Sequence, residues 1–164
     1  MGKKKAARKT QYWLFKTEPT SYSIDDLAKD KKTHWDGVRN YQARNMLRDE
    51  IQVGDRVFFY HSNAKPPGIV GTAEVVKAGY PDHTQFDPDD KHYDEKADPD
   101  APTWYMVDIK FLQKFPELID REQLSADETA QNMAVLARGS RLSIQSVKPA
   151  EWKAVHKLAG VKDT

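Results

Sequence analysis

The sequence predicts an α+β domain in which five strands form a small, highly curved mixed sheet or partly closed barrel with peripheral helices. Three observations support this class. Five short segments have the composition or the alternation of strands, and helical patterns are inserted between them. Their order lacks regular β-α-β alternation, which argues against a doubly wound parallel sheet. The length of 164 residues suits one domain with its own core, and no internal repeat is visible.

The first half of the chain alternates strand patterns with helical patterns. The aromatic run at 12–16 predicts a buried strand. Ser23 and Asp26 match a capping box and predict the start of a helix of about two turns. Residues 39–50 predict a second helix, with apolar side chains broadly on one face. Residues 56–61 are rich in aromatic and β-branched side chains and predict the next strand.

The second half contains three further strand patterns and the remaining helices. A long loop with four prolines covers roughly 79–102, and loops of this length are usually functional or mobile. Pro149 favours the first position of a final helix, and Gly160 predicts its end. The other expected elements are a strand at 69–76, a strand at 104–112, short helices at about 120–125 and 127–136, and a strand at 141–147.

The formal net charge of +1 conceals an uneven distribution of charge. Residues 1–11 carry five basic and no acidic side chains and predict a disordered basic arm. Residues 82–100 carry eight acidic side chains against two lysines. The charges of these two segments nearly cancel, so the rest of the chain is close to neutral. Charge alone would hold such a body weakly to nucleic acid, and a pocket would have to add affinity. We expect one domain over 12–160 and a short tail at 161–164.

Composition and motifs exclude several classes of function. The chain has no cysteine, which removes disulfides, thiol nucleophiles and thiolate zinc sites and fits a reducing compartment. No apolar run approaches the roughly 18 residues of a membrane span, so we expect no membrane partner. P-loop, dinucleotide and nucleophile-elbow motifs are missing. The acidic loop fails the calcium pattern because Lys91 and His92 occupy ligand and glycine positions. We expect no cofactor and no metal, with a zinc site of loop histidines and aspartates as the open alternative.

Two segments rich in aromatic, amide and guanidinium groups lie near expected strand ends. One runs from Trp35 to Asn45, and the other starts at Tyr60 and offers a ring, an imidazole, a hydroxyl and an amide. Such groups can stack a planar base and hydrogen-bond its edge. Arg39 and Arg44 fan around a helix start, whose free N–H groups suit phosphate. The competing interpretation is that Trp35 and Tyr60 are core aromatics and the polar groups are helix caps.

Long segments of the chain resemble the EVE domain family. The matching segments are YWLFKTEP at 12–19, WDGVRNYQARN at 35–45, FYHSN at 59–63 and PPGIVG at 66–71, followed in order by shorter matches at 80–82, 104–108 and 141–143. Serine is frequent in the family at the position of Thr17. The resemblance covers about 12–159 and implies a PUA-like mixed β pseudo-barrel of about five or six strands with peripheral helices. PUA, ASCH and YTH domains would be its relatives.

The resemblance also implies a nucleic-acid-associated module that accommodates a modified base in an aromatic pocket. The expected base is a modified cytosine in DNA, with RNA left open. Trp35 or Tyr60 would stack on the base, and Asn40 and Ser62 would read its edge. Carried over position by position, the base-binding pocket would consist of Lys16, Thr17, Trp35, Asn40, Tyr60, His61, Ser62, Tyr80 and Arg141.

Phosphate contacts are expected from three basic features of the chain. Arg39, Arg44 and the basic arm would hold the nucleic-acid backbone. Arg141 has a competing interpretation, in which it pairs with Asp36 or Glu18 as buried structure. We expect a monomer, located in the cytoplasm of a bacterium or in the nucleus of a eukaryote.

Two other functions remain open at this point. Some ASCH relatives look like amidohydrolases that use Lys, Thr and Glu, and Lys16, Thr17 and Glu74 are available in comparable strands. A lysine could be activated there by burial. The EVE-type motifs do not contain this triad as a unit, so we expect a non-catalytic protein. The third function is a protein-interaction module with an occluded pocket.

Overall fold

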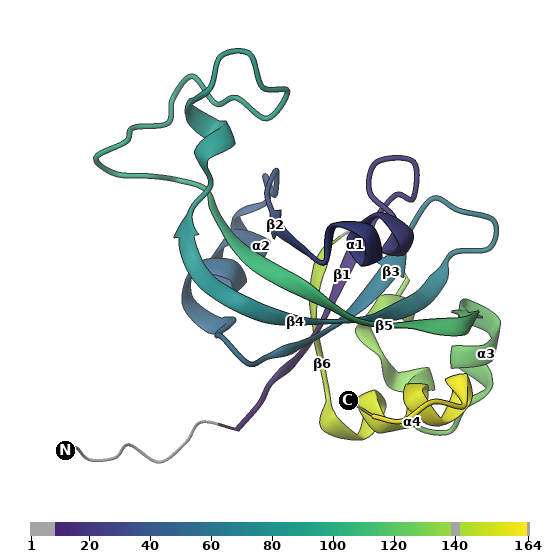
Figure 1. Cartoon of the computed structure of the whole chain (residues 1–164). Coiled ribbons are helices and arrows are strands. Elements are labelled where there is room, and N and C mark those ends of the chain that lie inside the picture. Colours follow the sequence, from purple (N-terminus) through teal and green to yellow (C-terminus); the bar gives the residue numbers. More distant parts are fainter. Residues whose placement is uncertain (1–8, 139–141, 164) are drawn as a thin grey trace.

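A single six-stranded mixed sheet organises the computed structural model, which describes residues 9–138 and 142–163 (Figure 1). Its strands are β1 (Tyr12–Thr17), β2 (Lys32–Trp35), β3 (Arg56–His61), β4 (Gly68–Pro81), β5 (Tyr105–Asp120) and β6 (Ile144–Val147). Their order across the sheet is β2-β5-β4-β3-β1-β6. β1 is parallel to β3, and the other pairs are antiparallel. With β2 and β6 as its edges the sheet curves without closing, which confirms the predicted α+β class with a mixed sheet and peripheral helices.

Eight helical elements surround the sheet in the described part of the chain. They are α1 (Ile24–Asp30), α2 (Tyr41–Asn45), the π-helical η1 (Met46–Glu50), the 3-10 helices η2 (His83–Phe86), η3 (Ala130–Asn132) and η4 (Ala134–Leu136), α3 (Arg121–Ala126) and α4 (Pro149–Ala159). The predicted capping box is confirmed, because the Ser23 hydroxyl accepts from the Asp26 N–H and the Asp26 carboxylate accepts from the Ser23 N–H. α4 ends, as expected, at Gly160 in the left-handed conformation, with a φ of 70°.

Three sequence expectations need correction. No strand was expected at β2, whose four residues bury only Trp35 and so carry almost no strand pattern. The helix expected at 127–136 is replaced by η3 and η4, because extended backbone at Met133 separates them. β4 and β5 are 14 and 16 residues long, well beyond the expected ends at 76 and 112.

A bulge explains how β5 continues so far. Ile69 of β4 pairs with Ile119, but Gly71, two residues on, pairs with Lys114. The extra residues of β5 therefore form a bulge opposite β4, and they include Pro116. Proline is tolerated in strands at such positions because no ladder hydrogen bond is needed from it.

Both faces of the sheet are buried, and alternating side chains serve the two faces. Phe15 and Phe59 lie in one apolar cluster with Trp35 and with residues of α1 and α2. Phe58 and Tyr60 lie in a second cluster, with residues of α3, η3, η4 and α4. Because successive strand side chains point to opposite faces, the continuous apolar run of β3 supplies both cores.

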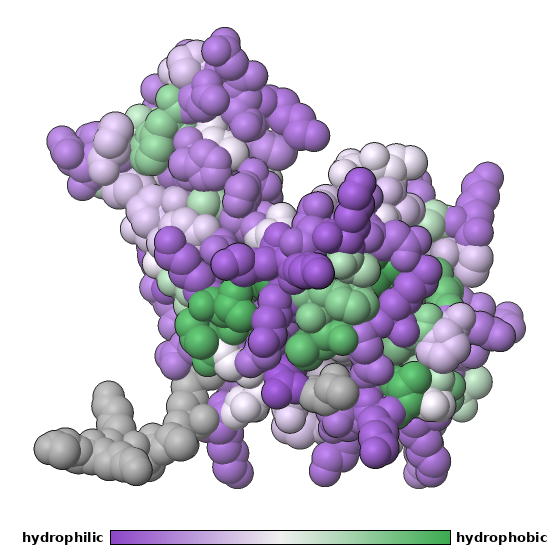
Figure 2. Space-filling view, in the orientation of Figure 1, coloured by the Kyte–Doolittle hydropathy of each residue, from purple (hydrophilic) through white to green (hydrophobic). Residues whose placement is uncertain are grey.

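The loop at 82–104 projects from one end of the sheet, and its surface is mostly hydrophilic (Figures 1 and 2). A fully buried amide, Gln85, joins its two ends. The Gln85 Nε2 group donates to the carbonyls of Asp82 at 2.7 Å and Trp104 at 2.8 Å. Its Oε1 atom accepts from the N–H groups of Thr103 and Trp104. The base of the loop is therefore fixed to the sheet from both sides.

Candidate functional site

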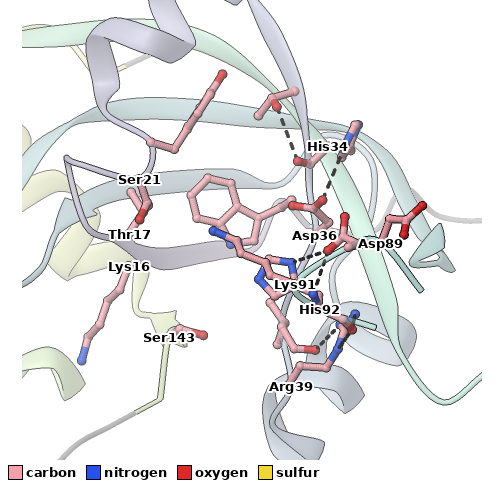
Figure 3. Close-up of a pocket in the computed structure, with 16 residues that line it drawn as sticks. Lys16, Thr17, Ser21, His34, Asp36, Arg39, Asp89, Lys91, His92 and Ser143 are labelled. Carbon is pink, nitrogen blue, oxygen red and sulfur yellow. Dashed lines mark hydrogen bonds and ion pairs between the residues drawn. The ribbon is translucent and has the colours of Figure 1, made fainter. Parts of the chain in front are cut away.

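A cavity of about 740 Å³ opens between the end of β1, strand β2 and the acidic loop (Figure 3). Its volume falls in the range of roughly 300–1,000 Å³ that is usual for small-molecule sites. The lining residues are Lys16, Thr17, Ser21, Tyr22, Thr33, His34, Trp35, Asp36, Gly37, Val38, Arg39, Asp89, Asp90, Lys91, His92 and Ser143. Four segments that are distant in the sequence therefore meet around one hollow.

The indole of Trp35 supplies a rigid aromatic surface in the cavity wall. Trp35 is 9% exposed, and it packs on two rings of the core. Its ring centroid lies 5.3 Å from that of Phe15 and 5.6 Å from that of Phe59, the second pair at 84°. Edge-to-face contacts of this kind hold an indole in one orientation. The ring is thus fixed before any ligand arrives.

Tyr22 is a second aromatic side chain of the lining. Its ring packs on Phe59 with centroids 6.5 Å apart, so Tyr22 and Trp35 rest on the same core ring. The Tyr22 hydroxyl donates to the Asp30 carboxylate at 2.8 Å. Burial, together with the hydrogen bond to Asp30, raises the pKa of Tyr22 to about 12. Tyr22 is therefore a neutral donor at any physiological pH.

Carboxylates gather at one side of the cavity. Asp36, Asp89 and Asp90 are among the lining residues of this side (Figure 3). The Asp36 carboxylate lies 3.8 Å from His34, and the Asp90 carboxylate lies 3.3 Å from the His92 imidazole. This side of the cavity offers acceptors for a ligand that carries N–H donors.

Arg39 fixes the acidic loop against the cavity. Its guanidinium donates twice to the His92 carbonyl, at 2.7 and 3.1 Å. It also donates to the Thr84 hydroxyl at 3.0 Å and forms a 3.0 Å ion pair with Asp82. These contacts use donors of Arg39 within the chain and give it a structural role, while the phosphate contact expected of it stays a prediction.

The carboxylate of Asp82 binds Arg39 and the backbone of Gly37, and so it holds the same segments together. Asp82 is fully buried. Its carboxylate accepts hydrogen bonds from the Gly37 N–H at 2.8 Å, from Arg39 and from Thr84. Burial acts to raise the pKa of Asp82, but the hydrogen bonds from Thr84, Gly37 and Arg39 outweigh it and lower the pKa. Asp82 is therefore ionised at neutral pH.

Lys16 and Thr17 line the opposite side of the cavity. The Lys16 N–H donates to the Ser143 carbonyl at 2.8 Å, which brings both residues to the rim. The amino end of Lys16 points away from Asp36 and Asp89 (Figure 3). Burial, with the nearby charge of Arg121, lowers the pKa of Lys16. The amino end of Lys16 is thus directed away from the carboxylates, whereas Lys91 of the acidic loop lies beside them in the lining.

Of the nine residues expected in a base pocket, the structure brings Lys16, Thr17 and Trp35 to the cavity. Tyr60 is not among the lining residues, because strand alternation places it in the core on the other face of the sheet. The expected pairing of Trp35 and Tyr60 around one base is therefore not what the geometry provides. Arg141 lies outside the described residues.

Three other expected residues have local structural partners instead. The Asn40 side chain caps α2 by accepting from the Ala43 N–H at 2.9 Å. His61 Nε2 accepts from the Ile24 N–H at 3.1 Å, and burial lowers the pKa of His61. The Ser62 N–H donates to the Thr17 carbonyl and extends the pairing of β1 with β3. None of the three belongs to the cavity lining.

The side chains of Tyr80 and Arg44 also form hydrogen bonds outside the cavity. The Tyr80 hydroxyl donates to the Asp108 carboxylate, and burial together with this bond raises the pKa of Tyr80. Arg44 Nη1 donates to the Thr103 carbonyl at 2.7 Å, and its guanidinium lies over the ring of Tyr41. Arg44 therefore fastens the end of the acidic loop to α2.

The residues of a hydrolytic Lys-Thr-Glu set are not assembled. Lys16 pairs with Tyr60 of β3, whereas Glu74 pairs with Arg56. Tyr60 and Arg56 are four residues apart on one strand, which corresponds to about 13 Å. Glu74 instead forms an ion pair with Lys110 at 3.5 Å. The geometry gives Lys16 no general base from Glu74.

Several lining residues were missed by sequence reasoning. Tyr22 precedes the Ser23 cap, and its position immediately before a helix was a usable signal for a buried aromatic ring. The segment 89–92 gave no such signal, because its acids predicted only a solvated loop. His34 precedes Trp35 in β2 and Asp36 follows the strand, and both line the same cavity.

The described residues contain neither a metal-binding group nor a membrane-spanning helix. In the ranges 9–138 and 142–163, no group of three or more His, Asp or Glu side chains is placed to hold a metal ion. No helix in that part of the chain combines the length and apolarity that crossing a membrane requires.

Sequence comparisons identify related proteins. The profile of the EVE domain matches residues 11–158. Thymocyte nuclear protein 1 of Homo sapiens is 42% identical over 168 aligned positions, covering 91% of this chain and 74% of the human protein. The uncharacterized protein C21.03c of Schizosaccharomyces pombe is 38% identical and covers 93% of this chain and 70% of its own length.

Solved structures share the fold. A hypothetical protein from Leishmania major is 43% identical with a TM-score of 0.87, covering 93% of this chain and 96% of that one. Human THYN1 protein, crystallised in complex with 5-methylcytosine containing DNA, is 39% identical with a TM-score of 0.85, covering 93% and 99%. An ASCH protein from Zymomonas mobilis is 12% identical with a TM-score of 0.54, covering 90% and 98%, and shares the fold alone.

Proposed function

This chain belongs to the EVE domain family, and on that premise we propose that it is a DNA-binding module that holds a modified cytosine in the cavity beside Trp35. The base would be turned out of its strand and received between Trp35 and the acidic loop. The complex of the human relative with 5-methylcytosine containing DNA supports the choice of DNA and of this modification. We propose binding, not chemistry, as the function.

The observation that carries the proposal is the preorganised indole in a cavity of about 740 Å³. Turning a base out of a duplex costs a few kcal/mol. Stacking of a base on an aromatic side chain contributes roughly 1–3 kcal/mol, and hydrogen bonds to the base edge add to this. Phe15 and Phe59 already hold the Trp35 ring in place, so little further ordering would oppose stacking.

The carboxylate side of the cavity favours cytosine over thymine. Carboxylates accept hydrogen bonds from the exocyclic amino group of cytosine, which thymine and uracil lack. Asp36 and Asp89 present such acceptors, and they lie across the cavity from Thr17 (Figure 3). The apolar part of the lining, which includes Val38, suits a 5-methyl group. We propose that this division sets the preference for a methylated cytosine.

The test is a binding titration with matched oligonucleotides. Duplex and single-stranded DNA would carry cytosine, 5-methylcytosine or 5-hydroxymethylcytosine at one position, with an RNA strand of the same sequence alongside. Wild-type protein is expected to prefer a modified DNA base, and Trp35→Ala should remove that preference. Trp35→Phe should keep part of it because an aromatic face remains.

Trp152→Phe is the matched control, since Trp152 is fully buried in the cluster on the other face of the sheet. It should retain the wild-type preference while losing comparable packing. Equal affinity of the wild type for all bases would refute the proposal. An unchanged preference in a folded Trp35→Ala protein would refute the assignment of the cavity.

The described cavity is built from one chain, which supports our proposal that the protein acts as a monomer. A nuclear location in a eukaryotic host, or a cytoplasmic one in a bacterium, follows if DNA is the partner. Tighter binding of the RNA strand than of any DNA strand would overturn the choice of nucleic acid.

A further inference from the structure

Lys16 and Arg121 bring two positive charges together near the ends of β1 and β3, on the face of the sheet that carries Tyr60. Lys16 pairs with Tyr60 across parallel strands, so their side chains lie next to each other on one face of the sheet. Arg121 Nη1 lies 3.5 Å from the Tyr60 hydroxyl and donates to the Val135 carbonyl at 2.8 Å. Tyr60 therefore lies between the two cations.

Neither cation has a carboxylate partner in the ranges that the structure describes. The ion pairs found there involve other basic residues, and the hydrogen bonds of Arg121 to described residues use Nη1 alone. The Lys16 amino group makes no hydrogen bond to a described residue. Burial and the charge of Arg121 both lower the pKa of Lys16, which is the sign of a cation without a counter-ion. The arrangement is unfavourable unless an anion joins it.

We infer that Lys16 and Arg121 form a binding site for a backbone phosphate of the nucleic acid whose base occupies the cavity. A phosphodiester brings one negative charge and oxygen acceptors that suit an ammonium and a guanidinium together. The site rests on the proposed function, because Lys16 also lines the cavity and its amino end points to the side opposite the carboxylates.

The position of the pair relative to the cavity supports a phosphate over another anion. Ser143 lies at the same rim, because the N–H of Lys16 donates to its carbonyl. A nucleotide held with its amino edge toward Asp36 and Asp89 would extend its sugar and phosphate away from those acids. The amino end of Lys16 points to that other side, so the two ends of the nucleotide would meet complementary charges.

The test measures affinity for methylated and unmodified duplexes over a series of salt concentrations. Lys16→Met and Arg121→Gln should each weaken binding to both duplexes by about tenfold, the loss of one charge-assisted hydrogen bond. Each should reduce the slope of log K against log salt by about 0.9, the value for one lost phosphate contact on duplex DNA. For Arg121→Gln, at a residue outside the cavity lining, the preference for the methylated duplex should stay at the wild-type ratio.

Lys16→Arg is the conservative variant and should restore affinity and slope. Lys153→Met, at an exposed position of α4, is the control for loss of one charge and should leave the slope unchanged. A neutral methylphosphonate linkage next to the methylated base should weaken the wild type but not Lys16→Met. That result would place the lost contact at one linkage.

Unchanged salt slopes in both variants would overturn the phosphate site, whether or not the wild type prefers a methylated base. A wild type without base preference would instead refute the proposed function, and the slopes would still report on phosphate. The mononucleotide 5-methyl-dCMP serves as a further probe. If it bound as tightly as the duplex, the pair would hold a terminal phosphate monoester and the assignment to a strand would be wrong.

Discussion

The guanidinium of Arg39 and the buried carboxylate of Asp82 form a 3.0 Å ion pair that joins the segment before α2 to the start of the acidic loop. The same guanidinium binds the carbonyl of His92, ten residues further along that loop. One side chain thus positions three segments around the cavity. The pair therefore contributes, together with β1 and β2, to the shape of the cavity.

Replacing Arg39 by Met should loosen the acidic loop and weaken the protein as a whole. Removing one partner of a largely buried pair leaves an uncompensated charge on Asp82 and costs about 3 kcal/mol of unfolding free energy. Urea denaturation measures this loss, and hydrogen exchange should show faster exchange at the Asp94 N–H, which is bonded to the Gln85 carbonyl. Arg48→Met, which removes an exposed pair with Asp49, is the control and should leave the urea midpoint close to that of the wild type.

Asp82 should give stability a measurable dependence on acid pH. Its pKa in the folded protein lies below the value of about 3.9 for an unfolded chain. The carboxylate therefore contributes stability that is complete above pH 3.9 and is lost as the pH falls through the folded pKa. Urea midpoints measured between pH 6 and 2 should fall less steeply for Asp82→Asn than for wild type. Asp100→Asn, in the exposed loop, should follow the wild-type curve, and identical slopes for all three would contradict the prediction.

Gly37 should resist substitution more strongly than another glycine with similar backbone. Gly37 and Gly54 both have positive φ, at 80° and 95°. A Cβ at Gly37 would lie 2.5 Å from the His92 ring, whereas one at Gly54 would meet nothing within 4 Å. Gly54→Ala should therefore cost only the backbone strain of about 1 kcal/mol, and Gly37→Ala should cost more and displace His92. Equal losses of thermal stability, with equal DNA binding, would show that the His92 contact is unimportant.

Asp55 should be one of the most sensitive positions outside the cavity. It is fully buried and accepts from the Trp13 indole N–H at 2.9 Å and from the N–H groups of Gln11 and Gln52. Asp55→Ala leaves these donors unsatisfied and should lower the unfolding free energy by about 3 kcal/mol. Chemical denaturation tests this, with Asp100→Ala as the exposed control. A loss below 1 kcal/mol would mean that water replaces the carboxylate.

Local patterns in the sequence were sufficient for much of the fold. The capping box at Ser23, the strand at 56–61 and the final helix between Pro149 and Gly160 each depend on neighbouring residues, and each is present. β2 could not be found in this way, because its pairing with β5 supplies what its four residues lack in apolar pattern. The formation of β2 therefore depends on its partner strand and not on its own sequence.

The candidate site divides in the same manner. Trp35 was predicted to bind a base from the motif around it; the structure places it in the cavity wall, and its binding role stays a prediction. Tyr60 was predicted to join Trp35 in the pocket because of the polar residues that follow it in the sequence. However, successive strand residues point to opposite faces, so Tyr60 and its neighbour Phe59 could not share one face of the sheet. The contribution of His92 was not predictable, since it depends on a hydrogen bond to Arg39 across 53 positions of sequence. No pattern in the residues next to His92 indicates that contact.

The amide of Gln85 has a consequence for how this protein can diversify. By closing the base of the acidic loop, it separates the tip from the sheet, so insertions or deletions beyond the closure leave the β4–β5 pairing intact. The tip includes the segment 89–92 that borders the cavity. Evolution can therefore change the ligand range of this scaffold by altering loop length alone, without having to repack a core.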